Sequence, residues 1–177
     1  MRKLFRNMLL ALAAICASHV PAAAQLAVGD DAPDFTTKAA MAGTEFGYSL
    51  AMALRQGPVV LYFYPKAFTS GCTLEANAFA EAMPQFKAAG ASVIGMSNDN
   101  IETLKRFSRE ECRDAFPVAV AEGKTMIAYD VGKGDSSYAS RTSYVIAPDG
   151  RIAFVHSNSD YRGHVKKTLE AVRKLAK

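Results

Sequence analysis

The sequence has no tryptophan and only three cysteines among its 177 residues, and one of these, Cys16, lies close to the start of the chain. Cysteine is therefore too scarce for a disulfide-rich scaffold. The chain also has no internal repeat, no low-complexity linker and no apolar run of membrane-spanning length after residue 25. Residues 25–177 are therefore expected to form one domain, long enough to bury a sizeable core.

The formal net charge of +4 is modest and lies mostly at the start of the chain. Arg2, Lys3 and Arg6 supply three of the positive charges, and residues 1–24 contain no acidic residue. Residues 25–177 therefore carry a net charge of +1, which is +4 less those three. This balance indicates neither a nucleic-acid partner nor stable association with an anionic membrane.

Residues 1–24 have the pattern of a secretory signal peptide. A basic start is followed by the short apolar run Met8–Ala17 and by three alanines, after which we expect cleavage behind Ala24. The protein is therefore predicted to be exported, to the periplasm of a bacterium. A membrane anchor is the alternative, but the apolar run is short for it. Cys16 follows the bulky Ile15, which disfavours lipid attachment, so we assign it to the removed segment.

Apolar periodicity predicts alternating strands and helices in the remaining chain. Residues 58–64 are apolar and rich in β-branched and aromatic side chains, which is typical of a strand buried on both faces. The other predicted elements are a helix at 72–89, a strand at 91–97, a helix within 98–112, a hairpin at 141–156 around Pro148–Gly150, and a helix at 165–175. This order indicates an α/β fold, with a mixed central β-sheet flanked by helices.

The two central helices are predicted in more detail. In the first, Pro84 lacks the N–H that would bond to Ala80, so we expect a kink there. Asn98 or Asn100 is the expected N-cap of the second. The apolar stripe of the first helix comprises Leu74, Ala78, Phe79, Ala82 and Phe86, and Ile101, Leu104 and Ser108 share one face of the second.

A cysteine at the start of the first long helix, directly after a buried strand, is the thioredoxin-like arrangement. Active-site cysteines of that fold usually form a C-x-x-C pair, but here the tetrapeptide is Thr69-Ser70-Gly71-Cys72. Without the first cysteine, Cys72 cannot form the local disulfide that thiol–disulfide exchange needs. We therefore expect a reaction that a single thiolate begins. A Cys72–Cys112 disulfide is nevertheless possible, because an isolated cysteine pair in an exported protein often forms one.

Peroxide cleavage suits these groups. A thiolate at a helix N-terminus can attack one peroxide oxygen, and N–H donors can stabilise the charge that develops on the other. Gly71 would let the backbone approach the substrate closely.

Pro65–Cys72 fits the pattern P-x-x-x-T-x-x-C, which resembles the signature of the peroxiredoxins. The wider stretch "YFYPKAFTSGCTLEA" is similar to the bacterioferritin comigratory protein (PrxQ) branch of the AhpC/TSA family, and the resemblance extends over roughly residues 27–176. It implies a thioredoxin-like fold and a thiol-dependent peroxidase that reduces hydrogen peroxide and organic hydroperoxides. It also implies recycling by a thioredoxin-like or other thiol reductant, with no cofactor and no metal.

The resemblance assigns roles to individual residues. Cys72 would be the peroxidatic nucleophile, Thr69 would hydrogen-bond the thiolate and the peroxide, and Pro65 would shield the sulfur from solvent. Arg141 would stabilise the thiolate and bind peroxide, although an arginine in such a strand is more often a surface charge. Glu75 would orient that arginine, unless it is an exposed helix glutamate.

The chain departs from many PrxQ relatives at position 77, where Asn77 replaces a resolving cysteine. In other relatives the resolving cysteine lies in the next helix, and Cys112 is the candidate for that role. Its spacing of four from Ser108 places it on the same helix face. Two alternatives stay open: Cys112 is a buried structural thiol, or an external thiol resolves a one-cysteine enzyme. The sequence has no extended C-terminal tail with a further cysteine, so we expect a monomer or weak dimer.

Other residues are expected to be structural. His156 and His164 have no ligand spacing and are predicted to lie on the surface, and no metal site is implied. Phe35, Phe46 and Tyr48 are predicted to pack in the core. A non-enzymatic domain with this fold would be expected to have lost Thr69, Cys72 or Arg141.

Overall fold

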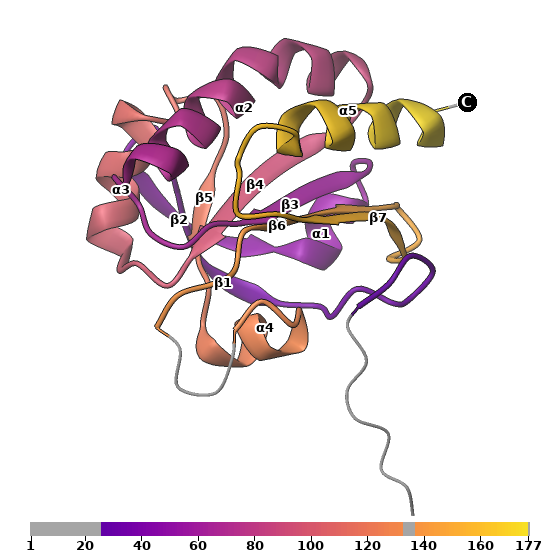
Figure 1. Ribbon diagram of the computed structural model, residues 1–177, viewed down its shortest axis with the longest axis horizontal. Helices are drawn as coiled ribbons and strands as arrows, with labels where there is room; N and C mark the ends of the chain where they lie inside the picture. The colour runs from indigo at the N-terminus through magenta and orange to yellow at the C-terminus, as the bar shows by residue number, and fades with distance from the viewer. Residues whose placement is uncertain (1–25, 133–136, 177) are drawn as a thin grey trace, which may run out of the picture.

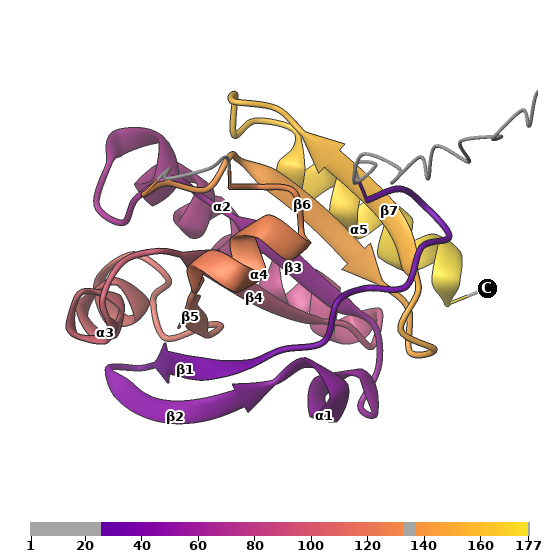
Figure 2. The ribbon, with the colours of Figure 1, turned by 90° about the horizontal axis from the view of Figure 1, so that it is seen from below.

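The structure is a computed structural model, which describes residues 26–132 and 137–176. A seven-stranded mixed sheet with the strand order β2-β1-β5-β4-β3-β6-β7 forms its centre. Strands β3, β4 and β5 are parallel, whereas β6 pairs with β3 in the antiparallel direction. Helices lie on both faces of the sheet, with α2 and α5 on one and α4 on the other (Figures 1 and 2). The predicted α/β fold with a mixed sheet is confirmed.

The structure contains seven strands and five helices within the described residues. The strands are β1 (Thr36–Met41), β2 (Thr44–Ser49), β3 (Val59–Phe63), β4 (Ser92–Ser97), β5 (Val118–Val120), β6 (Thr142–Ile146) and β7 (Ile152–Ser157). The helices are α1 (Leu50–Leu54), α2 (Ser70–Ala88), α3 (Ile101–Glu110), α4 (Gly123–Ala128) and α5 (His164–Leu175). Every element predicted from the sequence is present. Of these twelve, β1, β2, α1, β5 and α4 had no counterpart in the sequence prediction.

Strand β3 separates two apolar cores, as its continuous apolar run predicts. All five of its residues are buried. Val60 and Tyr62 face the core that α2, α3 and α5 cover, and Val59, Leu61 and Phe63 face the opposite core. This alternation follows from the two-residue period of a strand. Because β3 is fixed from both sides, the loop that follows it starts from a rigid position.

Helix α2 differs from its predicted pattern at one turn. Leu74 was predicted to lie on the buried stripe, but it is 49% exposed, and the neighbouring Glu75 is fully buried. The prediction was wrong because it used hydrophobicity alone. In the structure the side chain of Glu75 points inward to the buried Arg141, and Leu74 next to it therefore points outward. The helix continues through Pro84.

Helix α3 begins at Ile101, and the side chain of Asn100 caps it by accepting a hydrogen bond from the N–H of Thr103 at 2.9 Å, as expected. It ends at Glu110, so Cys112 lies in the turn beyond the helix and not on its face. The N–H of Cys112 still bonds to the carbonyl of Phe107 at 3.0 Å, which keeps Cys112 close to the C-terminal end of α3.

The predicted signal peptide and Cys16 lie outside the described residues, so cleavage and export stay predictions. Within the described part of the chain, the helices are all too short or too polar to cross a lipid bilayer.

Candidate active site

The loop from β3 to α2 holds a strained residue just before the helix. Phe68 has a backbone φ of 62°, in the left-handed region that bulky residues rarely adopt. Its ring packs edge-on against Phe107 with centroids 5.2 Å apart, and the guanidinium of Arg106 lies 5.1 Å from its centre. Such strain persists where surrounding contacts enforce it, and it is common at functional sites. Here it turns the chain so that Thr69 becomes the N-cap of α2.

Asp99, two residues after the end of β4, also holds the loop between β3 and α2 in place. Its Oδ2 accepts the N–H of Ala67 at 2.7 Å and the hydroxyl of Ser97 at 2.8 Å. The sequence prediction missed Asp99, because it considered the segment 98–100 only as helix caps. A hint was available, since β3 and β4 are adjacent parallel strands whose carboxyl ends meet at one sheet edge.

Cys72 lies in the first turn of α2 and is 1% exposed. The Nη2 group of Arg141 donates to its sulfur at 3.4 Å. The Thr69 side chain makes no capping hydrogen bond, so it leaves the first-turn N–H groups free of a side-chain cap. A cation and the positive end of the helix dipole thus both lie next to the sulfur, where they can stabilise negative charge that develops during a reaction.

Gly71 leaves space for the close approach of Arg141. A Cβ atom at position 71 would lie 3.3 Å from Nη2 of Arg141, which is closer than an ordinary van der Waals contact. The sequence prediction attributed the glycine to close approach of the substrate. The structure shows that the arginine also uses this space.

Strand pairing brings Arg141 to the site. Phe63 at the end of β3 pairs with Thr142 at the start of β6, so the residue before Thr142 lies beside the loop that leads to Cys72. The alternative interpretation of Arg141 as a surface charge does not fit its position, since its side chain is only 7% exposed.

Glu75 and Arg141 form a buried ion pair, in which Nη1 of the arginine donates to Oε2 of the glutamate. Nε of Arg141 donates to the carbonyl of Ser159 at 3.1 Å. Each of the three guanidinium nitrogens therefore donates a hydrogen bond: Nε to Ser159, Nη1 to Glu75 and Nη2 to Cys72. Burial raises the pKa of Glu75 to about 8, and the Arg141 guanidinium offsets this rise only in part. Because an arginine stays charged, a carboxylate beside it leaves no unpaired buried cation. Glu75 is therefore a buried partner of the arginine and not an exposed helix residue.

His164 is fully buried at the start of α5, which corrects the prediction of a surface histidine. Its Nε2 lies 3.0 Å from the carbonyl of Asn158, and its Nδ1 lies 2.7 Å from the hydroxyl of Ser143. Since a carbonyl can only accept, Nε2 carries the proton, and a neutral ring accepts from Ser143 at Nδ1. Nδ1 is also 3.8 Å from Oε1 of Glu75. The prediction failed because nothing local in the sequence shows that three elements converge on this ring.

The burial of His164 makes the stability of the fold depend on pH. Burial lowers its pKa from 6.5 to about 4, so the unfolded chain binds a proton more readily between these values. The contribution is therefore complete above about pH 6.5 and is lost as the pH falls toward 4. Between pH 7 and 4.5 we expect the wild type to lose about 2 kcal/mol more unfolding free energy than His164→Gln. Urea unfolding at both pH values measures this. Equal losses in the two proteins would contradict it.

Thr69 and Pro65 lie three and seven residues before Cys72 in the chain. The hydroxyl of Thr69 donates to the carbonyl of Lys66 at 2.9 Å, and its oxygen keeps acceptor capacity. Pro65 is half-buried at the end of β3. Their roles toward peroxide stay predictions.

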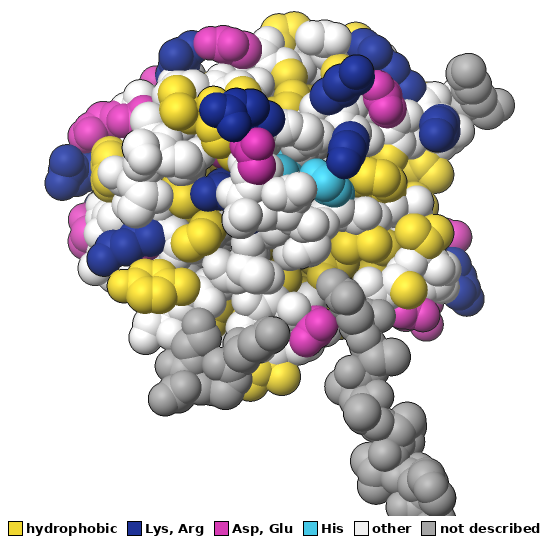
Figure 3. All heavy atoms as spheres, viewed as in Figure 1, with side chains coloured by type: hydrophobic (Ala, Val, Ile, Leu, Met, Phe, Trp, Pro, Cys, Tyr) yellow, Lys and Arg dark blue, Asp and Glu magenta, His cyan; other side chains and the backbone are white. Residues whose placement is uncertain are grey.

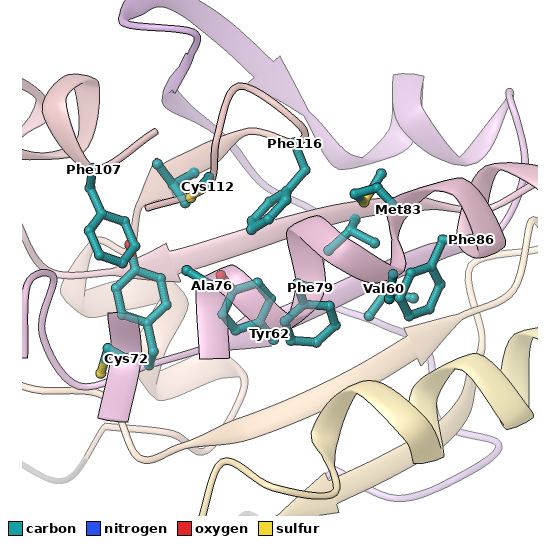
Figure 4. Close-up of a cluster of buried hydrophobic side chains, with 14 of the residues drawn as sticks. Val60, Tyr62, Cys72, Ala76, Phe79, Met83, Phe86, Phe107, Cys112 and Phe116 are labelled. Carbon is teal, nitrogen blue, oxygen red and sulfur yellow. The ribbon is translucent and has the colours of Figure 1, made fainter. Parts of the chain in front are cut away.

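Cys112 belongs to the same apolar cluster as Cys72, and both cysteines are free thiols. Burial raises the pKa of the Cys112 thiol, and the nearby carboxylates of Glu111 and Asp114 raise it further. In Figure 4 the sulfur of Cys72 points away from Cys112. The two thiols are therefore not arranged for a bond in this state.

The remaining predictions concern packing and metal binding. Phe35 is buried and stacks on the partly buried Tyr48, as expected, but Phe46 on β2 is 39% exposed, because this edge strand has no neighbour on its outer side. His156 is partly buried. Among residues 26–132 and 137–176, no three acidic, histidine or cysteine side chains are grouped to hold a metal ion.

Comparison with known proteins gives a consistent result. Residues 28–155 match the AhpC/TSA family. The chain is 32% identical over 127 residues to peroxiredoxin Bcp of Xanthomonas campestris, covering 67% of this chain and 78% of that protein. It is 34% identical over 159 residues to a putative peroxiredoxin bcp of Helicobacter pylori, covering 84% and 99%. The crystal structure of peroxidoxin BcpB from Mycobacterium tuberculosis superposes with a TM-score of 0.77 at 31% identity, covering 85% and 98%.

The matched region contains β1 to β6 and the start of β7, and it includes both Cys72 at the start of α2 and Arg141 before β6. This fold is the thioredoxin-like fold of the peroxiredoxins, a class of thiol peroxidases. Within that class, the chain belongs to the AhpC/TSA family, in its Bcp/PrxQ branch. The family resemblance noted in the sequence is thereby confirmed.

Proposed function

We propose that this peroxiredoxin reduces hydrogen peroxide and organic hydroperoxides with Cys72 as the peroxidatic cysteine. The observation that carries the proposal is the contact of 3.4 Å between Nη2 of Arg141 and the Cys72 sulfur at the start of a helix. The buried Glu75 and the Ser159 carbonyl fix that guanidinium, so it does not have to reorganise during the reaction.

The proposed chemistry uses groups already in place. The Cys72 thiolate attacks one peroxide oxygen, the O–O bond breaks, and the second oxygen leaves as hydroxide or alkoxide and takes up a proton. Cys72 becomes a sulfenic acid. Arg141 and the first-turn N–H groups of α2 stabilise the negative charge as it moves from sulfur to oxygen.

Cys112 is proposed to resolve the sulfenic acid as an intramolecular disulfide, which a thioredoxin-like protein then reduces. Such a bond needs Cα atoms within about 7 Å. The two cysteines lie on separate elements with their sulfurs not facing each other (Figure 4). The first turn of α2 and the turn at 111–114 therefore have to open, and element ends open at low free energy.

A one-cysteine peroxidase with an external thiol reductant is the second candidate. The observation in its favour is the burial of Cys112, which raises the pKa of its thiol and makes it a poor nucleophile in the closed state. Thiol–disulfide exchange is the weaker alternative, because Thr69 occupies the position of the first cysteine of a C-x-x-C pair.

Peptide mapping separates these candidates. After one equivalent of hydrogen peroxide, we expect a Cys72–Cys112 crosslink within one chain in the wild type. In Cys112→Ser the sulfenic acid should persist and over-oxidise to sulfinic acid as peroxide is raised. A wild type that shows only sulfenic acid, or only a Cys72-linked dimer, would support the one-cysteine mechanism.

A further inference from the structure

Two polar contacts attach the turn that carries Cys112 to the outer side of α2. Nδ2 of Asn77 donates to Oε2 of Glu111 at 3.3 Å, and Nη1 of Arg113 lies 3.1 Å from Oε1 of Glu81. Asn77 and Glu81 are one helical turn apart, and Glu111 and Arg113 flank the cysteine on either side. The Cys112 turn is therefore held at two points.

The first of these contacts also reaches toward Cys72. Nδ2 of Asn77 donates at 2.9 Å to the carbonyl of Thr73, the residue that follows the peroxidatic cysteine. One amide group thus joins the first turn of α2 to the turn of Cys112. If the start of α2 unwinds through Thr73 and beyond, Asn77 loses its place opposite Glu111.

The Cys112 turn stores backbone strain that favours its opening. Arg113 and Asp114 have φ values of 52° and 56°, so two consecutive residues other than glycine are left-handed. Such conformations are unfavourable unless surrounding contacts hold them. The N–H of Asp114 bonds to the carbonyl of Ser108 at 3.1 Å, which holds the turn closed against this strain. The side-chain contacts to α2 also hold it closed. Removing a contact should therefore shift the turn toward its open form.

We propose that Asn77 is a positioning residue that couples the unwinding of α2 to the release of Cys112. This inference rests on the proposed resolving role of Cys112. While α2 is intact, the contact with Glu111 keeps the thiol buried. When Cys72 is oxidised and the first turns unwind, the contact breaks and the turn opens. The Cys112 sulfur then attacks the Cys72 sulfur, the S–O bond breaks and an S–S bond forms. The hydroxyl group and the thiol proton leave as water.

A double-mutant cycle tests the coupling through the rate of disulfide formation after a single peroxide pulse, followed by acid quenching and mass spectrometry. We expect Asn77→Ala to accelerate this step about threefold, a typical effect of one exposed or half-buried polar contact. In the Glu111→Ala background the same substitution should accelerate the step clearly less, because only the bond to the Thr73 carbonyl and the helix propensity still change. The cycle removes the separate effects of helix propensity and of the lost carboxylate on Cys112.

Amide exchange of residues 111–116 gives an independent readout in the reduced protein. It should be slow in the wild type and faster in Asn77→Ala and in Glu81→Ala. Glu110→Ala is the matched control, because it removes an exposed ion pair with Arg106 within α3 and no contact with α2. Unchanged exchange and rate in Asn77→Ala, or equal acceleration in both backgrounds, would overturn the coupling. A wild type without the disulfide would overturn both the coupling and the resolving role.

Discussion

Cys72→Ser is expected to lose all peroxidase turnover. A serine hydroxyl stays protonated beside Arg141, so it provides no nucleophile for the O–O bond at neutral pH. Its oxygen fits the space of the sulfur, and the Glu75–Arg141 pair lies to one side of it, so the variant should fold. Peroxide consumption with dithiothreitol as the reductant measures the effect. The rate should fall to that of dithiothreitol alone.

Cys112→Ser is the matched control for this prediction, because it removes an equally buried thiol from the same cluster. It should keep the first oxidation of Cys72 at the wild-type rate, since its thiol takes no part in breaking the O–O bond. Turnover that persists in Cys72→Ser, or a first oxidation that fails in Cys112→Ser, would contradict the assignment of Cys72 as the peroxidatic cysteine.

Arg141→Gln is expected to slow the oxidation of Cys72 by about 100-fold, the usual cost of removing one preorganised donor at developing charge. The substitution removes the cation that lies 3.4 Å from the sulfur and the donor that would face the leaving oxygen. Stopped-flow oxidation of the reduced protein by hydrogen peroxide measures the rate.

Two further variants separate charge from position. Arg141→Lys keeps the charge but not the planar fork that spans Cys72, Glu75 and the Ser159 carbonyl, so its rate should be intermediate. Arg162→Gln removes an exposed arginine that pairs with Asp160 in the nearby loop, and it should leave the rate unchanged. Equal losses in Arg141→Gln and Arg162→Gln would indicate a general effect of net charge.

The surface of the protein is consistent with a local role for Arg141. Lys and Arg side chains are interspersed with Asp and Glu over the face shown in Figure 3. The groups that act directly on the sulfur are those next to it. The guanidinium and the start of α2 are such groups.

The elements predicted correctly from the sequence are those with a strong local pattern. The apolar run of β3, the hairpin of β6 and β7, and the amphipathic α5 all follow from the spacing of their own residues. Strands β1 and β2 are present in the structure, but the sequence analysis did not predict them. In β2 the exposed residues outnumber the half-buried ones, and it is an edge strand whose pairing with β1 determines its conformation. Short patterns of this kind carry little information without the partner strand.

The candidate site was predictable only as far as the motif extends. Cys72, Thr69 and Pro65 share one short segment, and the family resemblance supplied Arg141 and Glu75. Asp99 and His164 were missed, because each acts through contacts between residues distant in sequence. Glu75 also shows the limit of hydrophobic patterning: a carboxylate is buried where Leu74 is exposed. Its burial depends on Arg141, which precedes β6 and lies far from Glu75 in the sequence, so no periodicity within α2 can reveal it.

The pairing of Phe63 with Thr142 has a consequence for how this enzyme can vary in length. Cys72 and Arg141 are 69 positions apart, yet hydrogen bonds between two neighbouring strands place the guanidinium. The intervening chain can therefore gain or lose residues in the segment before β6 without moving the arginine. A shift of one position in the pairing itself would instead turn the side chains of β6 to the opposite face of the sheet. Changes in chain length are thus expected in the connections only, because the sheet register holds Cys72 and Arg141 next to each other.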